Sequence, residues 1–160
     1  MNFKKHSGIY TLTTEQVLNI SLEEAWEFFS APENLQKITP PHMGFKITSA
    51  IDKKAYAGQI IAYKVGILPG IKQNWVTEIT QVKTNSFFID EQRFGPYKMW
   101  HHEHWFYEQP NGKTVMKDKI SYKIPFGILG HLAQQVFIKK QLTHIFNHRY
   151  LTLERIFNEQ

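Results

Sequence analysis

Residues 45 to 124 read as six successive β-strands, and this run limits the possible folds more than any other feature of the sequence. The segments are rich in β-branched and aromatic residues, and turn-forming pairs such as Ala57-Gly58, Pro69-Gly70 and Gly95-Pro96 divide them. The predicted strands are 45–51, 58–66, 72–83, 86–94, 97–108 and 113–124. Because the connections are short, consecutive strands must pair antiparallel, which predicts a meander.

One strand and a short helix are expected before the meander. Residues 9–20 predict a first strand, which brings the sheet to about seven strands. Ser21 then begins a helix over 21–30, since Glu24 three residues later completes a capping box and apolar residues recur at helical spacing.

Two further helices complete the predicted fold. A second short helix is expected within 31–41, where Pro40-Pro41 prevents its continuation. Residues 130–157 predict one long helix, roughly 42 Å in length, that no proline interrupts. The chain, residues 1–160, is therefore expected to form a single α+β domain, in which a curved antiparallel sheet surrounds the long C-terminal helix.

Composition excludes several classes of site. The chain has no cysteine, which excludes disulfides, thiolate metal sites and cysteine nucleophiles. Its net charge is +5, but lysine and arginine are spread from Lys4 to Arg155 without a cluster of more than two, so no nucleic-acid partner is expected. The first 16 residues are polar, and no apolar run approaches the ~20 residues that span a bilayer. A cytoplasmic location without stable membrane insertion is predicted, and the oligomeric state is left open.

The two-helix insertion "SLEEAWEFFSAPENLQKITPP", followed by the meander and the terminal helix, resembles the START-like, or SRPBCC, superfamily. The segments "WVTEIT", "FFIDEQRFGPYKMWHHEHWF", "MKDKISYKIPFGILG" and "KKQLTHIFNHRY" are further similar to a bacterial branch of small SRPBCC proteins. That branch is similar to the domain fused to epimerase-like "cell-division inhibitor" proteins. The resemblance implies a helix-grip fold with an apolar cavity between the sheet and the terminal helix, and implies no particular reaction.

The last predicted strand carries one residue that does not fit its face. In "TVMKDKISYKI", lysines alternate with apolar residues, so one face is solvated and the other looks inward. Asp118 falls on the inward face. A buried carboxylate needs a partner, so Asp118 either joins an internal polar cluster or lies at a strand end in contact with water.

The preceding strand, "KMWHHEHWFY", offers histidines as partners. Placing Glu103 outside turns Trp100, His102 and His104 inward, and leaves His101 and Trp105 outside. If the turn at 110–112 contains a bulged residue, His104 lies opposite Asp118; a plain two-residue turn would put His104 beside Lys119 instead.

Three functions are compatible with these residues. The first is binding of a small apolar ligand, lipid-like or aromatic, whose polar group is oriented by an internal cluster. The candidate ligand-binding residues are Trp75, Trp100, His102, His104, Asp118 and Tyr122. The second is a cyclase-, dehydratase- or isomerase-type enzyme that uses His104 and Asp118 as general acid and base. The third is an interaction protein with a filled core.

A metal is the weaker interpretation of the same residues. His102 and His104 at i, i+2 can ligate one ion with Asp118, but the three groups equally form a hydrogen-bond network without an ion. No metal and no cofactor are therefore predicted. His144 and His148 are expected on a solvated helix face. One carboxylate of Asp90-Glu91 must point inward, and the sequence does not say which.

Overall fold

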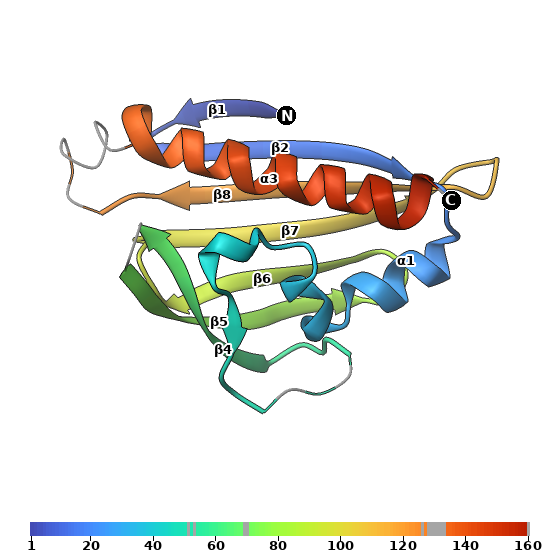
Figure 1. Cartoon of the computed structure of the whole chain (residues 1–160), viewed down its shortest axis with the longest axis horizontal. Coiled ribbons are helices and arrows are strands. Elements are labelled where there is room, and N and C mark those ends of the chain that lie inside the picture. Colours follow the sequence, from blue (N-terminus) through green and yellow to red (C-terminus); the bar gives the residue numbers. More distant parts are fainter. Residues whose placement is uncertain (51, 53, 69–70, 126, 128–133, 160) are drawn as a thin grey trace.

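The chain folds into one curved antiparallel sheet of eight strands with its helices on one face (Figure 1). The computed structural model describes residues 1–50, 52, 54–68, 71–125, 127 and 134–159. The strands are β1 (Asn2–His6), β2 (Ile9–Leu18), β3 (Lys46–Ile47), β4 (Gln59–Leu68), β5 (Ile71–Lys83), β6 (Phe87–Phe94), β7 (Met99–Glu108) and β8 (Thr114–Lys123). Their order across the sheet is β1-β2-β8-β7-β6-β5-β4-β3.

The first short helix and the described part of the C-terminal helix lie where the sequence predicts them. Helix α1 (Leu22–Phe29) begins at the Ser21-Glu24 capping box. Two 3₁₀ turns follow it, η1 (Pro32–Gln36) and η2 (Pro41–Met43). Helix α3 (Lys139–Leu153) continues at both ends into the π-helical turns η3 (Gln134–Ile138) and η4 (Glu154–Asn158). In Figure 1, α3 runs in front of β2 and β8, and α1 lies beside its C-terminal end. The predicted α+β class and helix-grip architecture are confirmed.

Three local features differ from the sequence prediction. Strand β1 was not predicted, because its polar residues are mostly exposed and lack alternation. Positive φ angles at Ser7 (47°) and Gly8 (76°) form the tight turn that pairs it with β2. The segment 31–41 forms 3₁₀ turns rather than a helix, and strand 45–51 shortens to β3. The predicted break at Pro69-Gly70 and the first residues of the predicted helix 130–157 lie outside the described residues.

Side-chain contacts hold α3 along the sheet. Gln16 of β2 donates from Nε2 to the Tyr150 carbonyl (3.1 Å) and to Glu154 Oε1 (2.8 Å). Asn158 Nδ2 donates to the Val17 carbonyl at 3.0 Å. Beneath the helix, Phe146 belongs to a buried apolar cluster on the inner face. These contacts run along the helix, and they place its buried side against the inner face of the strands.

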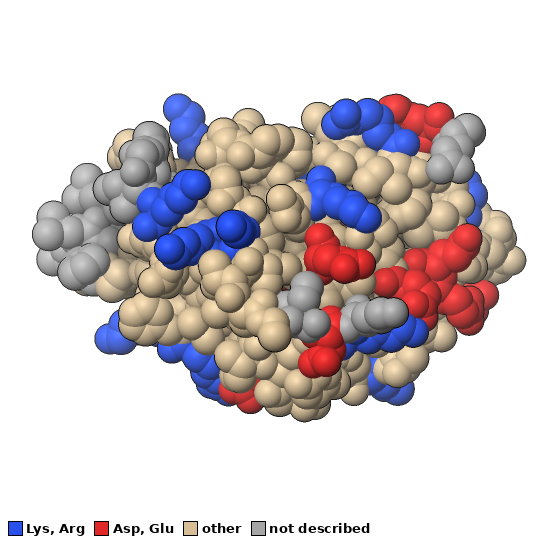
Figure 2. All heavy atoms as spheres, turned by 60° about the horizontal axis from the view of Figure 1, so that its bottom comes forward, with Lys and Arg blue, Asp and Glu red and all other residues tan. Residues whose placement is uncertain are grey.

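The surface carries its charges in separate groups. On the face shown in Figure 2, lysine and arginine side chains lie at several places apart, and acidic side chains gather at one side. Within the part of the chain that the structure describes, no helix is both long enough and apolar enough to cross a membrane.

The β7–β8 hairpin sets the register on which the candidate site depends. Glu108 pairs with Thr114, and the loop between them closes with a Gln109 N–H to Lys113 carbonyl hydrogen bond of 2.8 Å. Gly112 donates to the Gln109 carbonyl (2.9 Å) and has a φ of 74°. A tight turn followed by a glycine in the left-handed conformation is typical of a three-residue hairpin loop with a bulge. Of the two turns that the sequence left open, the structure has the bulged one, which puts His104 opposite Asp118.

Replacing Gly112 tests this loop. Nothing lies within 4 Å of a Cβ added there, so the cost of Gly112→Ala comes from its left-handed backbone. We expect Gly112→Ala to lower the free energy of unfolding by about 1–2 kcal/mol in urea titrations. Gly112→Asn should lose less, because asparagine adopts this conformation more readily. Equal losses for both variants would contradict the backbone explanation.

Candidate functional site

A cluster of buried polar side chains lies at the centre of the inner face, on three adjacent strands. His102 and His104 come from β7, and the register places His104 opposite Asp118 of β8 and His102 opposite Asp90 of β6. The two histidines and Asp118 are 5–7% exposed. The alternation of β7 and β8 therefore turns the residues inward that the sequence analysis selected, and the pairing with β6 adds Asp90 to them.

Two carboxylates hold the two imidazole rings. His102 Nε2 donates to Asp118 Oδ1 at 2.9 Å, and His104 Nε2 donates to Asp90 Oδ2 at 2.8 Å, because an ionised carboxylate only accepts. His104 Nδ1 lies 3.0 Å from the same Asp118 oxygen, without the alignment of a hydrogen bond. His102 Nδ1 is 3.6 Å from Asp90 Oδ2. Each ring thus has one nitrogen toward each carboxylate.

Arg149 brings a charge from the long helix into the cluster. It is 7% exposed, and its Nη2 lies 3.5 Å from Asp118 Oδ1. The same nitrogen donates to Met116 Sδ at 3.8 Å, and the guanidinium carbon stands 5.6 Å from the ring centre of Phe29 and 5.9 Å from that of Phe146. The guanidinium is therefore enclosed by aromatic rings, with the Asp118 carboxylate as its counter-charge.

The surroundings shift the pKa values of the two histidines in opposite directions. Burial and the neighbouring His104 lower the pKa of His102, and its contacts with the carboxylates do not offset them. Burial also acts to lower the pKa of His104, but its contacts with Asp118 and Asp90 outweigh burial and raise it. Burial acts to raise the pKa of Asp118; the Arg149 charge and both histidines overcome it, and hold this pKa well below its usual value. His104 is thus the ring that carries a proton more readily.

A cavity of about 200 Å³ opens beside the cluster, between the sheet and α3. Most of its lining is aromatic or aliphatic, and the polar groups of Asp90, His102, His104 and Arg149 border one part of it. Leu35 of η1, 37% exposed, also lines it, so the cavity reaches the protein surface at this turn. The arrangement places a charged, hydrogen-bonded group in the wall of an apolar space.

The structure brings most of the predicted site residues to this cavity. Trp75 and Trp100 line it, with their ring centres 5.2 Å apart and nearly perpendicular, and so do His102 and His104. Asp118 and Tyr122 are not among its lining residues. Asp118 lies behind the two histidines that line this cavity, and it lines a second cavity of about 120 Å³.

Tyr122 is fully buried and packs against other rings instead. Its ring centre lies 5.7 Å from Tyr10, 5.8 Å from Tyr97 and 6.1 Å from Trp100. The sequence analysis placed it beside the His-Asp cluster because it shares a face with Asp118. Four residues along a strand separate them by about 13 Å, which is enough to reach a different part of the core.

Other described histidines lie outside this cluster. His101 Nδ1 lies 2.8 Å from Glu91 Oε1, so Glu91 is the outward member of the acidic pair. Trp105 is covered by Phe87 of the next strand, with ring centres 4.6 Å apart. On the helix, the ring of His144 lies near that of His42, tilted against it, with ring centres 5.3 Å apart.

Sequence reasoning missed two members of the cluster, Asp90 and Arg149. Asp90 was known to belong to a pair that splits between the faces, but the bulges between β5 and β6 hide which carboxylate turns inward. Arg149 sits on a helix whose polar residues are spread around it, and no local pattern marks it. The available signal was the unpaired carboxylate of Asp118, which called for a cation.

Comparisons with known proteins identify the fold. No protein-family model matches the chain, and no curated protein matches it by sequence. Among solved structures, CV1439 from Chromobacterium violaceum has a TM-score of 0.69 at 13% identity, covering 94% of this chain and 99% of its own. A START superfamily protein from Mycobacterium smegmatis has a TM-score of 0.69 at 12% identity, covering 93% and 97%. Protein Ms6760 from the same organism has a TM-score of 0.66 at 16% identity, covering 98% of each chain. The chain therefore has a START-like helix-grip fold.

The Asp118-Arg149 pair can be tested by removing one partner and then both. Asp118→Asn leaves the Arg149 charge buried without its carboxylate, so we expect a loss of about 3–5 kcal/mol in the free energy of unfolding. The double variant Asp118→Asn, Arg149→Met should lose less, because no unpaired charge remains. Lys119→Met serves as a control, since it breaks the more exposed Lys119-Glu103 pair (2.8 Å) and should cost less than about 1 kcal/mol. A control loss as large as that of Asp118→Asn would contradict the buried-pair interpretation.

The same pair predicts an acid dependence of stability. Because the folded pKa of Asp118 is lowered, its stabilising contribution is present above the unfolded pKa of about 3.9 and is lost as pH falls through the folded pKa. Urea titrations from pH 7 down to acid should show a steeper decline for the wild type than for Asp118→Asn. Parallel declines would show that Asp118 has the same pKa in both states.

Proposed function

We propose that the protein binds a small apolar molecule with one hydrogen-bond-accepting group, in the cavity between the sheet and α3. The observation that carries this proposal is the cavity itself, an apolar space with a buried polar cluster on one wall. Such a combination is the usual composition of a small-molecule site. The START-like fold supports the same function.

The size of the cavity limits the ligand. About 200 Å³ is larger than the roughly 150 Å³ cavity that accepts benzene, and smaller than the roughly 300–1,000 Å³ of sites for drug-sized ligands. The expected ligand is therefore a monocyclic aromatic or a short branched molecule rather than a long-chain lipid. Aromatic side chains such as Trp75, Trp100 and Phe88 favour an aromatic ring.

Unpaired donors around the cavity indicate the polar group. Among the described residues, the buried Trp75 Nε1 and Arg149 Nε have no hydrogen-bond partner, and both residues line the cavity. A buried donor without an acceptor costs about 1–3 kcal/mol. A carbonyl or carboxylate oxygen on the ligand would satisfy these donors, and the Arg149 charge favours the carboxylate.

We also propose, from the sequence alone, that the chain belongs to the bacterial SRPBCC branch that is similar to the domain fused to epimerase-like proteins. A cytoplasmic location and the absence of a nucleic-acid partner also stay predictions, the latter because the basic residues are dispersed along the chain.

Ligand titrations test the proposal directly. Phenylacetate and toluene have similar rings, and only the first carries an acceptor. We expect phenylacetate to change the tryptophan fluorescence saturably with one molecule per chain, and to bind at least about 10-fold more tightly than toluene, since one charge-assisted hydrogen bond contributes about 1.5–3 kcal/mol. Native mass spectrometry of protein purified from its source, followed by solvent extraction, would identify the natural molecule.

A cavity-filling variant provides the matched control. Val65 is 5% exposed and lines the cavity, so Val65→Phe should weaken phenylacetate binding at least about 10-fold while the fold is retained. Val17→Phe makes the same change on an exposed residue of β2 and should leave binding unchanged. The proposal is wrong if no apolar probe binds saturably and nothing is extracted from the purified protein.

A further inference from the structure

We propose that Asp90, His102 and His104 form a binding site for one divalent transition-metal ion of the zinc class. The site goes beyond the proposed ligand binding and does not rest on it, because an ion would bind whether or not the cavity holds an organic molecule. Three features carry the inference: the convergence of three ligand atoms, the residues that hold them from behind, and the space in front of them.

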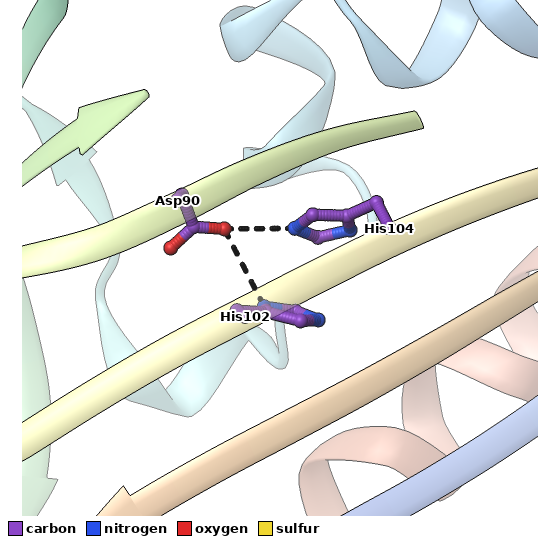
Figure 3. Close-up of side chains that lie close together, drawn as sticks. All are labelled: Asp90, His102 and His104. Atoms are coloured by element: carbon purple, nitrogen blue, oxygen red, sulfur yellow. Dashed lines mark hydrogen bonds and ion pairs between the residues drawn. The ribbon is translucent and has the colours of Figure 1, made fainter. Parts of the chain in front are cut away.

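The ligand atoms already lie at coordination spacing. Asp90 Oδ2, His102 Nδ1 and His104 Nε2 lie within 4.8 Å of one another (Figure 3). The carboxylate oxygen is 2.8 Å from His104 Nε2 and 3.6 Å from His102 Nδ1. Bonds of about 2.0–2.2 Å place neighbouring ligand atoms about 2.8–3.1 Å apart at octahedral angles and about 3.3–3.6 Å at tetrahedral angles. The two separations that involve the Asp90 oxygen fall within that span, and the two imidazole nitrogens lie within 4.8 Å of each other.

The sheet fixes the three groups relative to one another. Asp90 and His102 are direct cross-strand partners on β6 and β7, and His104 follows two residues along the same face. Phe88, stacked on His104 with ring centres 4.1 Å apart, limits the rotation of that ring. Ligands on neighbouring paired strands need little rearrangement, so most of the binding energy is available for the ion.

Asp118 supports the site in the manner of a carboxylate behind a metal-bound histidine. His102 uses Nε2 to donate to Asp118, which leaves Nδ1 as the nitrogen facing Asp90. His104 has the complementary arrangement, with Nδ1 toward Asp118 and Nε2 toward Asp90. Such outer carboxylates fix the tautomer and orientation of metal-binding histidines. The ion needs the lone pair of His104 Nε2, so in the neutral ring the proton moves from Nε2 to Nδ1, where it can be donated to Asp118. A cationic ring instead releases its Nε2 proton to solvent.

The charge balance of the cluster favours a cation. With both imidazoles neutral, Asp90 and Asp118 carry two negative charges, and Arg149 supplies one positive charge, placed at Asp118. The half-buried Asp90 carboxylate is then the negative charge without a permanent counter-charge. A divalent ion would supply that counter-charge at the point where the three ligand atoms meet.

The donor set and the cavity determine which ion fits. Two imidazole nitrogens and one carboxylate suit Zn²⁺, Fe²⁺ or Co²⁺ better than Mg²⁺ or Ca²⁺, which take oxygen ligands. All three residues also line the cavity, so further coordination positions face that space. Three protein ligands with an open position are typical of reactive or ligand-binding metal sites rather than structural ones.

Metal titration of the full chain tests the inference. After treatment with a chelator and its removal, equilibrium dialysis against ZnCl₂ should give one ion per chain. Substitution with CoCl₂ should produce visible absorption bands of a site with nitrogen and oxygen ligands. Neither measurement needs an organic ligand, and phenylacetate binding is measured separately, so failure of one proposal is distinguishable from failure of the other.

Matched variants locate the ion. Asp90→Asn, His102→Gln and His104→Gln should each weaken Zn²⁺ binding at least about 100-fold, and Asp118→Asn should weaken it about 10–100-fold while one ion per chain still binds. The double variant His144→Asn, His148→Asn removes the two histidines of α3, which lie outside the cluster, and should leave the affinity unchanged. Circular dichroism checks that each variant is folded.

Three outcomes would overturn the site. Wild-type protein that binds no Zn²⁺ at stoichiometric level contradicts it directly. Loss of binding in the His144, His148 double variant would place the ion on the helix surface instead. Unchanged affinity in a folded His102→Gln or His104→Gln variant would show that the ion does not bind to the cluster. If the buried variants do not fold, the Co²⁺ spectrum of the wild type and of the double variant decides.

Discussion

The buried carboxylate of Asp118 is the group on which the arrangement of the inner face depends. It lies on β8, accepts a hydrogen bond from His102, contacts His104, and faces the guanidinium of Arg149 from α3. An isolated carboxylate would be too costly at this depth. Its partners therefore link the long helix to the centre of the sheet, and they set the orientation of both imidazole rings.

The two faces of the sheet give the outward and the inward side chains of β7 different surroundings. On the outer face, His101 pairs with Glu91, and Lys119 pairs with Glu103, at positions that solvent screens. On the inner face, His102 and His104 are buried and contact carboxylates and aromatic rings. The same interactions are stronger there because the surroundings have a lower effective dielectric constant.

The cavity and the polar cluster depend on each other. The α1 and η1 segments cover part of the inner face, and α3 covers another part, which leaves about 200 Å³ between them. Arg149 Nε and Trp75 Nε1, whose residues line this cavity, lack hydrogen-bond partners among the described residues. A molecule with an accepting oxygen that pairs with these donors would gain the energy that the protein loses in keeping them unpaired.

The sequence alone determined the class of fold and the inward face of β8 that carries Asp118, and it limited the register of the β7–β8 pair to two alternatives. These follow from strand alternation and from the glycine-containing loop at 110–112, which are local properties that neighbouring residues express. The tertiary structure decided that Asp90 rather than Glu91 turns inward, and that Arg149 reaches Asp118. Bulges between β5 and β6 set the first, and the packing of α3 across the sheet sets the second. The first depends on where bulges fall in the pairing of two strands, and the second joins elements that meet only in the tertiary structure, so no local pattern in the sequence records them.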